Sequence, residues 1–370
     1  MKRLIRTVLL TIREQGSRLK TGLLVHKPVS PLAHKPISSL ACKPISLLLM
    51  SFLCLATFSD VRIAVKDVEG ADDNWHSSRK TDLLQFKHFE AIVRGSTGKQ
   101  HAIVATVAGN RYMYEAHAWL ANTDGWYEIY RATPKMKSEG SDVWTADGRL
   151  SYTGNMSTGW QVKSKGAEVA FEVVSTPERP VSQYSVTGSS ADFDGYISFR
   201  TKVDGKIVMG RQNMDVSGLG YCIHTFGDMG DHTAWRYVGF KDEKLCITAM
   251  NAQFDMDRLN MFVTVDSDMK MDQYEPDRVS WKELDQDTWQ ISATSKNGRR
   301  IDMTVGLIKP RPTNKDQPYA KYSLGFIDLS RTILCEYLAE IEATVTDPDL
   351  GGQMELRSLG VATRFDLRRD

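Results

Sequence analysis

A pair of alternating segments joined by a tight turn is the feature that most constrains the fold of this chain. Residues 289–294 alternate apolar and polar side chains, and residues 301–307 do so again after Asn297-Gly298. Asn-Gly readily adopts the positive φ angles of a two-residue hairpin turn. A period of two places successive side chains on opposite faces of a strand. The segment therefore predicts an antiparallel hairpin with one buried face.

The same pattern recurs along most of the chain beyond residue 60. Two more hairpins are predicted, with turns at Asp204-Gly205 and at Lys165-Gly166. Further alternating segments are residues 103–108, 112–120, 126–130, 244–249 and 261–265. Short strands at regular spacing, separated by turn signals, predict an all-β sandwich or barrel architecture.

One segment departs from this pattern. Residues 329–341 place Ile333, Tyr337 and Leu338 at the spacing of one helical face. A short helix near the C-terminus is therefore predicted.

The predicted strands fall into two blocks. At 370 residues the chain is long enough for two domains that each bury a core of their own. We predict a leader over residues 1–60, a first β-domain over 61–205 and a second over 206–370. Because no Pro, Gly or Ser-rich linker separates the two blocks, we expect the two β-domains to pack closely.

The leader differs from the rest in composition. An eight-residue unit containing Lys-Pro repeats over residues 26–46, and the apolar run 45–58 follows. Lys-Pro disfavours both helix and central strand, so the repeat predicts an irregular segment. The apolar run is short for a membrane span but suits a signal peptide or an anchor. We expect a secreted or membrane-associated protein, with a cytoplasmic location as the alternative.

Charge and cysteine spacing exclude several classes. The chain carries 47 basic and 46 acidic side chains, so no electrostatic argument favours a nucleic-acid partner. Its five cysteines form no CxxC pair and its histidines form no HExxH motif, so neither a metal site nor a cofactor is predicted. One disulfide among Cys222, Cys246 and Cys335 stays open, as does the oligomeric state.

A first polar cluster lies in the predicted strand 114–120. Alternation places Glu115, His117 and Trp119 on one face of that strand. A carboxylate and an imidazole inside a barrel would form an acid–base site. On an outward face they would form only the solvated side of the sheet.

The next predicted strand carries aromatic residues. Trp126 and Tyr130 lie on one face of it. Such residues either fill a barrel or line a pocket for an apolar ligand.

A glycine-rich stretch near the middle carries the second polar cluster. Between Gly218 and Asp228, alternation places Cys222, His224 and Phe226 on one face. Tyr221, Ile223 and Thr225 take the other face. His224 has a side chain that titrates near neutrality, and Asp228 is near enough in sequence to orient it. The alternative is a bulged strand that closes a barrel.

The stretch also supports a family resemblance. Gly218-Leu219-Gly220-Tyr221, followed after four residues by Phe226-Gly227-Asp228, resembles the signature of the carotenoid hydratase-like proteins. That superfamily includes hydroxyneurosporene synthase, kievitone hydratase and fungal decalin-forming Diels–Alderases. The preceding residues 203–210 resemble its hairpin, and residues 234–240 resemble the aromatic strand that follows. Members often carry a His-Asp pair after the tyrosine, where this chain has Cys222-Ile223.

The resemblance implies a fold and a chemistry. It implies two lipocalin-like β-barrels in tandem, and a pocket in which an apolar isoprenoid or polyketide is hydrated or cyclised. Hydration needs a general acid, for which the candidates are Glu115, His117, His224 and Asp228. Cyclisation needs mainly a pocket that preorganises the substrate. Predicted substrate-binding residues are Trp119, Trp126, Tyr130, Tyr221, Phe226 and Trp235. A non-catalytic carrier of a hydrophobic molecule is the alternative, and barrels filled only by their own side chains are the third.

Overall fold

The computed structural model describes most of the chain beyond residue 83 and short stretches before it. These are residues 59–60, 64–68, 73–75, 84–109, 114–188, 191–228, 233–254, 257–310, 320–324, 327–348 and 351–368. All of them belong to one compact unit, Ala56–Asp370. The predicted repeat at residues 26–46 and the apolar run 45–58 lie outside the described residues.

The described strands form two sheets. The N-terminal sheet runs in the order β6-β5-β4-β3-β14-β13-β11-β10-β9-β8-β7, and β12 pairs with both β13 and β2. Its strands are β2 (Ala64–Asp67), β3 (Leu84–Gly95), β4 (Gln100–Gly109), β5 (Tyr114–Asn122), β6 (Gly125–Ala132), β7 (Met136–Glu139), β8 (Asp142–Thr145), β9 (Leu150–Asn155), β10 (Gly159–Lys165), β11 (Val169–Pro177), β12 (Ser182–Thr187), β13 (Asp192–Met209) and β14 (Gln212–Asp228).

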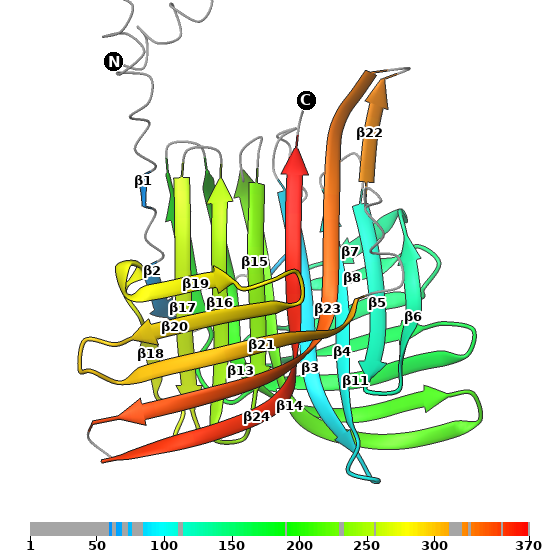
Figure 1. The fold of residues 1–370 in the computed structure, drawn as a ribbon. Coiled ribbons are helices and arrows are strands. Elements are labelled where there is room, and N and C mark those ends of the chain that lie inside the picture. Colours follow the sequence, from blue (N-terminus) through cyan, green and yellow to red (C-terminus); the bar gives the residue numbers. More distant parts are fainter. Residues whose placement is uncertain are drawn as a thin grey trace, which may run out of the picture. The chain divides into compact units, whose positions relative to one another are not determined.

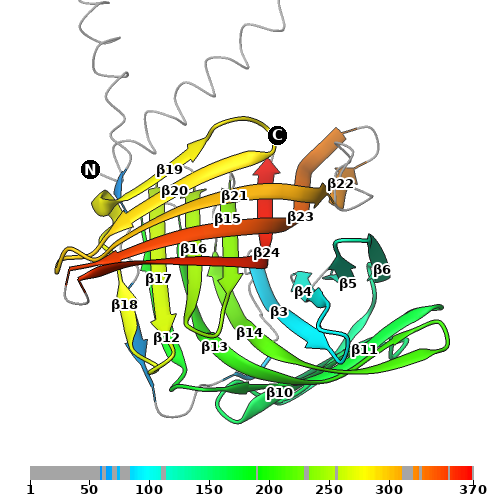
Figure 2. The same cartoon turned by 60° about the horizontal axis from the view of Figure 1, so that its bottom comes forward.

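The C-terminal sheet runs in the order β1-β17-β16-β15-β24-β23-β21-β20-β19, with β18 on β17 and β22 on β23. Its strands are β1 (Ser59–Asp60), β15 (Thr233–Lys241), β16 (Leu245–Phe254), β17 (Asp257–Asp266), β18 (Met271–Gln273), β19 (Val279–Glu283), β20 (Thr288–Thr294), β21 (Arg300–Pro310), β22 (Ala320–Leu324), β23 (Ile327–Asp347) and β24 (Gly352–Arg368). Apart from the parallel pair β1–β17, neighbouring described strands run antiparallel. Both sheets curl into half-barrels, and β23 and β24 bend along their length (Figures 1 and 2).

Each half-barrel has its own apolar core. The core of the N-terminal sheet includes Phe89, Trp160 and Phe171, and that of the C-terminal sheet includes Phe240 and Trp289. Two further clusters join residues of both sheets. The two sheets therefore also bury apolar side chains on the faces turned away from their own cores.

The predicted all-β class is confirmed, and two of the three predicted hairpin turns are present. Strands β20 and β21 pair in register, and Gly298 between them has a φ of 88°. Strands β10 and β11 pair on either side of the second turn, where the Gly166 amide donates to the Val169 carbonyl at 2.9 Å.

The third predicted turn, Asp204-Gly205, is wrong because both residues lie inside β13. The chain turns instead at Gly210, whose φ is 58°. Gly205 serves close packing, since a Cβ there would lie 2.3 Å from the Glu172 carbonyl oxygen. The domain boundary predicted after residue 205 also falls within β13, whereas the chain passes from one sheet to the other between β14 and β15.

The predicted C-terminal helix is wrong as well. Residues 329–341 belong to β23, which pairs with β24 over seventeen residues. Tyr337 and Leu338, expected on one helical face, contact different clusters, the C-terminal core and the inter-sheet cluster. Pairing with two long neighbouring strands overrides the weak local helical spacing. In the described part of the chain the only helical turn is a 3-10 turn, Pro276–Arg278.

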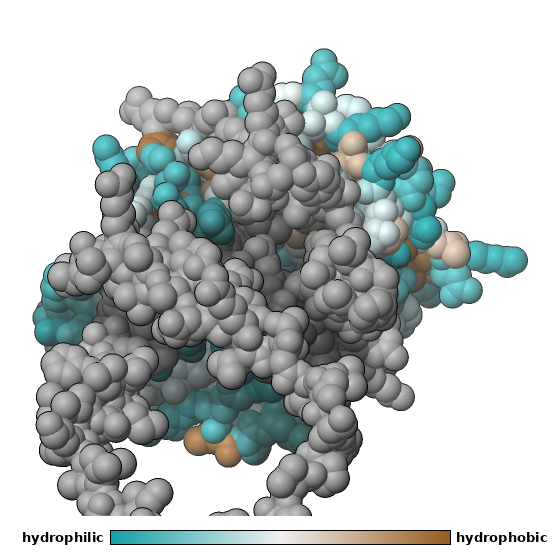
Figure 3. Space-filling model, turned by 90° about the horizontal axis from the view of Figure 1, so that it is seen from above, coloured by the Kyte–Doolittle hydropathy of each residue, from teal (hydrophilic) through white to brown (hydrophobic). Residues whose placement is uncertain are grey.

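Few large apolar side chains are exposed among the described residues. They are Val174, Val208, Leu284 and Ile308. The face in Figure 3 is mostly hydrophilic where it is coloured. A search of the described residues finds no helix long and apolar enough to cross a membrane.

Candidate functional site

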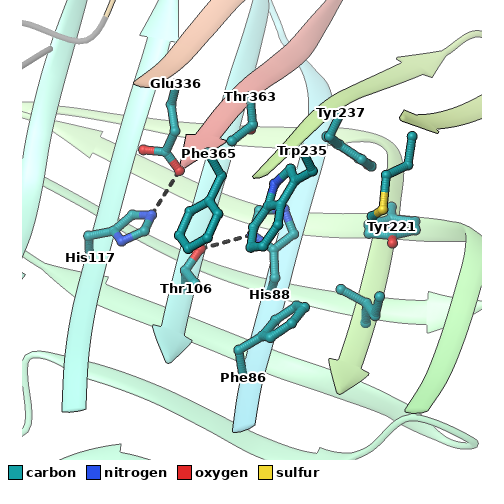
Figure 4. Close-up of a pocket in the computed structure, with 12 residues that line it drawn as sticks. Phe86, His88, Thr106, His117, Tyr221, Trp235, Tyr237, Glu336, Thr363 and Phe365 are labelled. Atoms are coloured by element: carbon teal, nitrogen blue, oxygen red, sulfur yellow. Dashed lines mark hydrogen bonds and ion pairs between the residues drawn. The ribbon is translucent and has the colours of Figure 1, made fainter. Parts of the chain in front are cut away.

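A cavity of about 110 Å³ lies between the two sheets. Strands β5, β4, β3 and β14 of the N-terminal sheet and β23, β24, β15 and β16 of the C-terminal sheet contribute all of its lining. The lining residues are Phe86, His88, Thr106, His117, Tyr221, Ile223, Trp235, Tyr237, Met250, Glu336, Thr363 and Phe365 (Figure 4). The cavity therefore lies on the faces of the sheets that point away from the two half-barrel cores.

Cross-strand pairing organises this lining into two rows. On the N-terminal sheet the directly paired residues are His117, Thr106, His88 and Ile223. On the C-terminal sheet they are Glu336, Thr363, Tyr237 and Met250. Because directly paired residues project to the same side of a sheet, each row presents its side chains together to the cavity.

His117 and Glu336 close the rows at one end. The His117 Nε2 and Glu336 Oε1 atoms lie 2.8 Å apart, and both side chains are almost fully buried. The Trp119 indole Nε1–H donates to the other carboxylate oxygen of Glu336 at 2.8 Å. His117 and Trp119 of β5 thus both contact one carboxylate from β23, and that carboxylate fixes the orientation of the imidazole.

A second imidazole–carboxylate pair lies two positions along the row. His88 Nδ1 is 2.8 Å from the Thr106 hydroxyl, and His88 Nε2 is 3.7 Å from Glu90 Oε2. The Tyr237 hydroxyl donates to Glu90 Oε1 at 2.7 Å, and Lys241 Nζ is 3.3 Å from the same oxygen. Burial works to raise the pKa of Glu90, but Lys241, His88 and Tyr237 outweigh it and hold that pKa below its usual value.

The phenols at the cavity are donors and not bases. Burial raises the pKa of Tyr221 and of Tyr237 well above the ordinary value, and the nearby Glu90 raises that of Tyr237 further. Both hydroxyls therefore keep their protons at neutral pH. Any proton accepted at this site goes to an imidazole or a carboxylate.

Aromatic and aliphatic side chains form the other end of the cavity. The Trp235 and Phe365 rings stack with centroids 3.7 Å apart, and they stand beside the polar row in Figure 4. A smaller cavity of about 40 Å³ shares Phe86, Ile223, Trp235 and Met250 with the first and continues among apolar residues of β13 and β17. The space is thus polar at one end and apolar at the other, which suits a mostly apolar ligand.

Several predicted site residues meet at this cavity. His117, Tyr221 and Trp235 line it, and Trp119 lies behind His117 with its ring against Trp126 at 4.2 Å. The alternation predicted for residues 114–120 is confirmed, because Ala116, Ala118 and Leu120 belong to the N-terminal core. Glu115 shares the face of His117 and is half-buried, one step farther along β5.

The other predicted residues lie elsewhere. Tyr130 packs against the N-terminal core and donates to Asp147. Asp228 is exposed at the end of β14. Phe226 contacts the ring of His224 at 5.5 Å.

His224 is fully buried in a charged cluster inside the N-terminal half-barrel. Its Nδ1 is 2.9 Å from Asp73 Oδ1, and Lys87 Nζ is 3.1 Å from the same oxygen. The Trp75 ring stacks on the imidazole. Cys222 lies on this inner face too, where burial raises the pKa of its thiol to about 12. Cys222, Cys246 and Cys335 are all free thiols, so the disulfide left open among them is absent.

Sequence reasoning missed Glu336, His88, Glu90 and Tyr237. If residues 329–341 had been interpreted as a strand, Glu336 would have fallen between Leu334 and Leu338 on one face. A single carboxylate in an apolar row is a signal for a buried functional group. In β3, His88 and Glu90 alternate with Phe89 and Ala91 in the same way. The described residues contain no group of three or more His, Cys, Asp or Glu side chains placed to hold a metal ion.

Comparisons with known proteins match the fold only. No family model and no curated protein matches the sequence. Kievitone hydratase from Nectria haematococca superposes with a TM-score of 0.56 at 10% identity, covering 75% of this chain and 88% of that one. An AttH candidate from Nitrosomonas europaea superposes with a TM-score of 0.55 at 12% identity, covering 80% and 96%.

The chain has the tandem lipocalin-like fold of the carotenoid hydratase-like proteins. The resemblance first drawn from Gly218–Asp228 is thereby confirmed for the fold. At 10–12% identity it carries over no residue roles, so the chemistry rests on the residues of this chain.

Proposed function

We propose that this protein is a hydratase-type enzyme that binds an apolar alkene, of isoprenoid or polyketide origin, between its two sheets and adds water to it. The observation that carries the proposal is the His117–Glu336 pair, a buried imidazole–carboxylate couple that lines an otherwise mostly apolar cavity. An ion pair with only a surface role would be exposed to solvent and would not line a buried apolar cavity. The fold shared with kievitone hydratase is consistent with this assignment.

In the proposed reaction the His117 imidazolium is the general acid. It transfers a proton to one alkene carbon, and positive charge develops on the neighbouring carbon. Water attacks that carbon and then loses a proton to a base. Glu336 stabilises the imidazolium before transfer, and Trp119 holds Glu336 in place from behind. General acid catalysis of this kind typically contributes about 10²–10⁴-fold to a rate.

Cyclisation of a polyene is the second candidate. The stacked Trp235–Phe365 wall and the adjoining apolar space could fold a flexible chain, which is most of what a cyclisation needs. A non-catalytic carrier would use the same apolar space. Neither needs a buried carboxylate paired to an imidazole at the cavity, so hydration explains more of the lining. We further propose that residues 45–58 bring the protein to a membrane, where apolar substrates partition.

The first test is extraction of the purified protein, with native mass spectrometry for a co-bound apolar molecule. The second is hydration of two probes, geraniol and 4-vinylphenol, measured in H₂¹⁸O by mass spectrometry of the alcohol product. Glu336→Gln and His117→Gln should each lower turnover about 100-fold or more. Glu340→Gln is the matched control, since Glu340 lies on the same strand but is exposed and bonds Arg357.

Two results would contradict the acid–base assignment. One is turnover of either probe that is unchanged in both His117→Gln and Glu336→Gln. The other is a tightly held apolar ligand that leaves the protein chemically unaltered, with no turnover of either probe, which would favour the carrier.

A further inference from the structure

Glu90 lies beside the cavity, two residues along β3 from the lining residue His88. It is almost fully buried, and its Oε1 atom has two partners, Tyr237 and Lys241. Its Oε2 atom accepts no hydrogen bond from the described residues. A buried carboxylate oxygen without a donor costs free energy. An oxygen in this state is expected to bind a small polar molecule.

The chain makes room for this carboxylate at a specific position. Gly239 on β15 faces Glu90, and a Cβ at residue 239 would lie 1.9 Å from Glu90 Oε1. Any side chain there would displace the carboxylate. The two sheets approach closely at this point only because one of them presents bare backbone.

The second carboxylate oxygen lies beside an imidazole at the cavity. Glu90 Oε2 is 3.7 Å from His88 Nε2, and His88 lines the cavity with a side chain that is 15% exposed. A molecule that bonds both atoms would therefore sit at the edge of the cavity, next to His88. One of its hydrogens would go to the carboxylate and the other to the unprotonated Nε2 of His88, which is a bonding pattern that water can make.

This place lies in the same row as the proposed acid. His88 and His117 are both paired with Thr106, one on each side. Two strand spacings separate their backbones by about 10 Å, and both side chains point into the cavity with Thr106 between them (Figure 4). A ligand lying across Thr106 would reach both imidazoles at once.

We propose that Glu90 Oε2 and His88 Nε2 form the binding site for the water that is added to the alkene. This inference rests on the proposed hydratase function and gives the second half of its chemistry. His117 supplies the proton that forms the new C–H bond from the alkene π electrons. The bound water forms the C–O bond at the adjacent cationic carbon and passes one proton to His88. Glu90 stabilises the resulting imidazolium, and both histidines re-equilibrate their protons with solvent. The sum is alkene plus water giving alcohol.

The first experiment is a high-resolution crystal structure of the full chain without added ligand. An ordered water about 2.6–3.2 Å from both Glu90 Oε2 and His88 Nε2 is the expected result. A structure in which Oε2 turns to a protein donor, or in which no water bonds it, would overturn the proposal whether or not a substrate is known.

The second experiment separates the two steps with isotopes, using geraniol and 4-vinylphenol. Protonation alone is read in D₂O as exchange of deuterium into the recovered alkene, and water addition is read in H₂¹⁸O as labelled alcohol. In His88→Gln and Glu90→Gln we expect ¹⁸O incorporation to fall about 100-fold, while deuterium exchange stays within about threefold of the native protein. Glu336→Gln should lose both signals, and exposed Glu172→Gln should lose neither.

Glu90→Gln removes the partner of Lys241 and could lower activity by destabilising the fold. His88→Gln leaves Glu90 and Lys241 paired, so a loss of ¹⁸O incorporation in that variant cannot be explained in this way. Equal loss of deuterium exchange and ¹⁸O incorporation in His88→Gln would refute a separate water site while leaving the proposed function in place. Native ¹⁸O incorporation in both variants would do the same. If the native protein turns over neither probe, the proposed function fails for these alkenes, and the crystal structure alone decides the water site.

Discussion

Removal of the Asp73 carboxylate should strongly destabilise the protein. Asp73 and Lys87 have fully buried side chains whose charged atoms lie 3.1 Å apart. The carboxylate also accepts hydrogen bonds from the Trp160 indole at 2.6 Å and from the Met156 amide at 3.0 Å. Without it, the Trp160 and Met156 donors and His224 lose this partner. Lys87 loses its counter-charge and keeps only two backbone carbonyls as acceptors among the described residues.

The size of the effect follows from these contacts. Breaking a buried ion pair by removing one partner typically costs about 3–5 kcal/mol. Burial lowers the pKa of Lys87 and Asp73 raises it, so loss of the carboxylate lowers that pKa further and reduces the penalty of a buried, unpaired ammonium. The loss of stability in Asp73→Asn should therefore lie near the lower end of that range, at about 3 kcal/mol. For a folded unit of this size the melting temperature should fall by roughly 5 °C.

Urea unfolding followed by tryptophan fluorescence, together with calorimetry, measures this loss. Lys87→Met should cost less than Asp73→Asn, because Asp73 keeps its other donors. Exposed Asp268→Asn is the control and should stay within about 0.5 kcal/mol of the native protein. An Asp73→Asn variant within about 1 kcal/mol of the native protein would refute the view that this carboxylate holds the cluster together.

Two further predictions concern titratable groups. The pKa of Glu90 is held below its usual value in the folded protein, so its contribution to stability is present above about pH 4.5 and is lost as the pH falls through the folded pKa. The stability gap between native protein and Glu90→Gln, measured by urea unfolding, should therefore narrow from pH 6 to pH 3, and a constant gap would contradict the charge argument. The pKa of Cys222 is raised to about 12 by burial, so iodoacetamide at pH 8 should leave this thiol unmodified in native protein and alkylate it in urea, as peptide mapping would show. Labelling of Cys222 at the same rate in both states would contradict its burial.

The sequence predicted those features that depend on local alternation. The hairpin around Asn297-Gly298 and the two faces of β5 and β14 follow from a period of two and a turn residue. The helix predicted over residues 329–341 failed because helical and strand spacing are hard to separate in a short apolar run. The segment is a strand because it pairs with β21 and β24. That pairing cannot be read from the spacing of side chains within residues 329–341.

The candidate site could be predicted only in part for a related reason. His117 was found because it stands out within its own strand. Its partner Glu336 lies 219 residues away, so the pair depends on how two sheets face each other and not on any local spacing. His224 was an equally good candidate in the sequence. In the structure it lies on the face of β14 that points into the half-barrel, where it contacts Asp73.

The two faces of β14 explain why the glycine-rich stretch matters for chemistry that it does not perform. On one face His224 and Cys222 lie within the N-terminal half-barrel, and on the other Tyr221 and Ile223 line the cavity. A slip of one residue in strand register would exchange these faces and would put a buried charge partner into the cavity.

Close packing at the glycines opposes such a slip. A Cβ at Gly218 would lie 2.1 Å from the Ile92 carbonyl oxygen, and one at Gly220 would lie 2.9 Å from the Glu90 carbonyl oxygen. On its other side β14 pairs with β13, and the register of that pairing shifts between Ser198 and Thr201, next to Gly220. A slipped β14 would bring side chains to positions that only glycine fits. The glycines therefore fix the register of β14 against β3, and β3 carries His88 and Glu90.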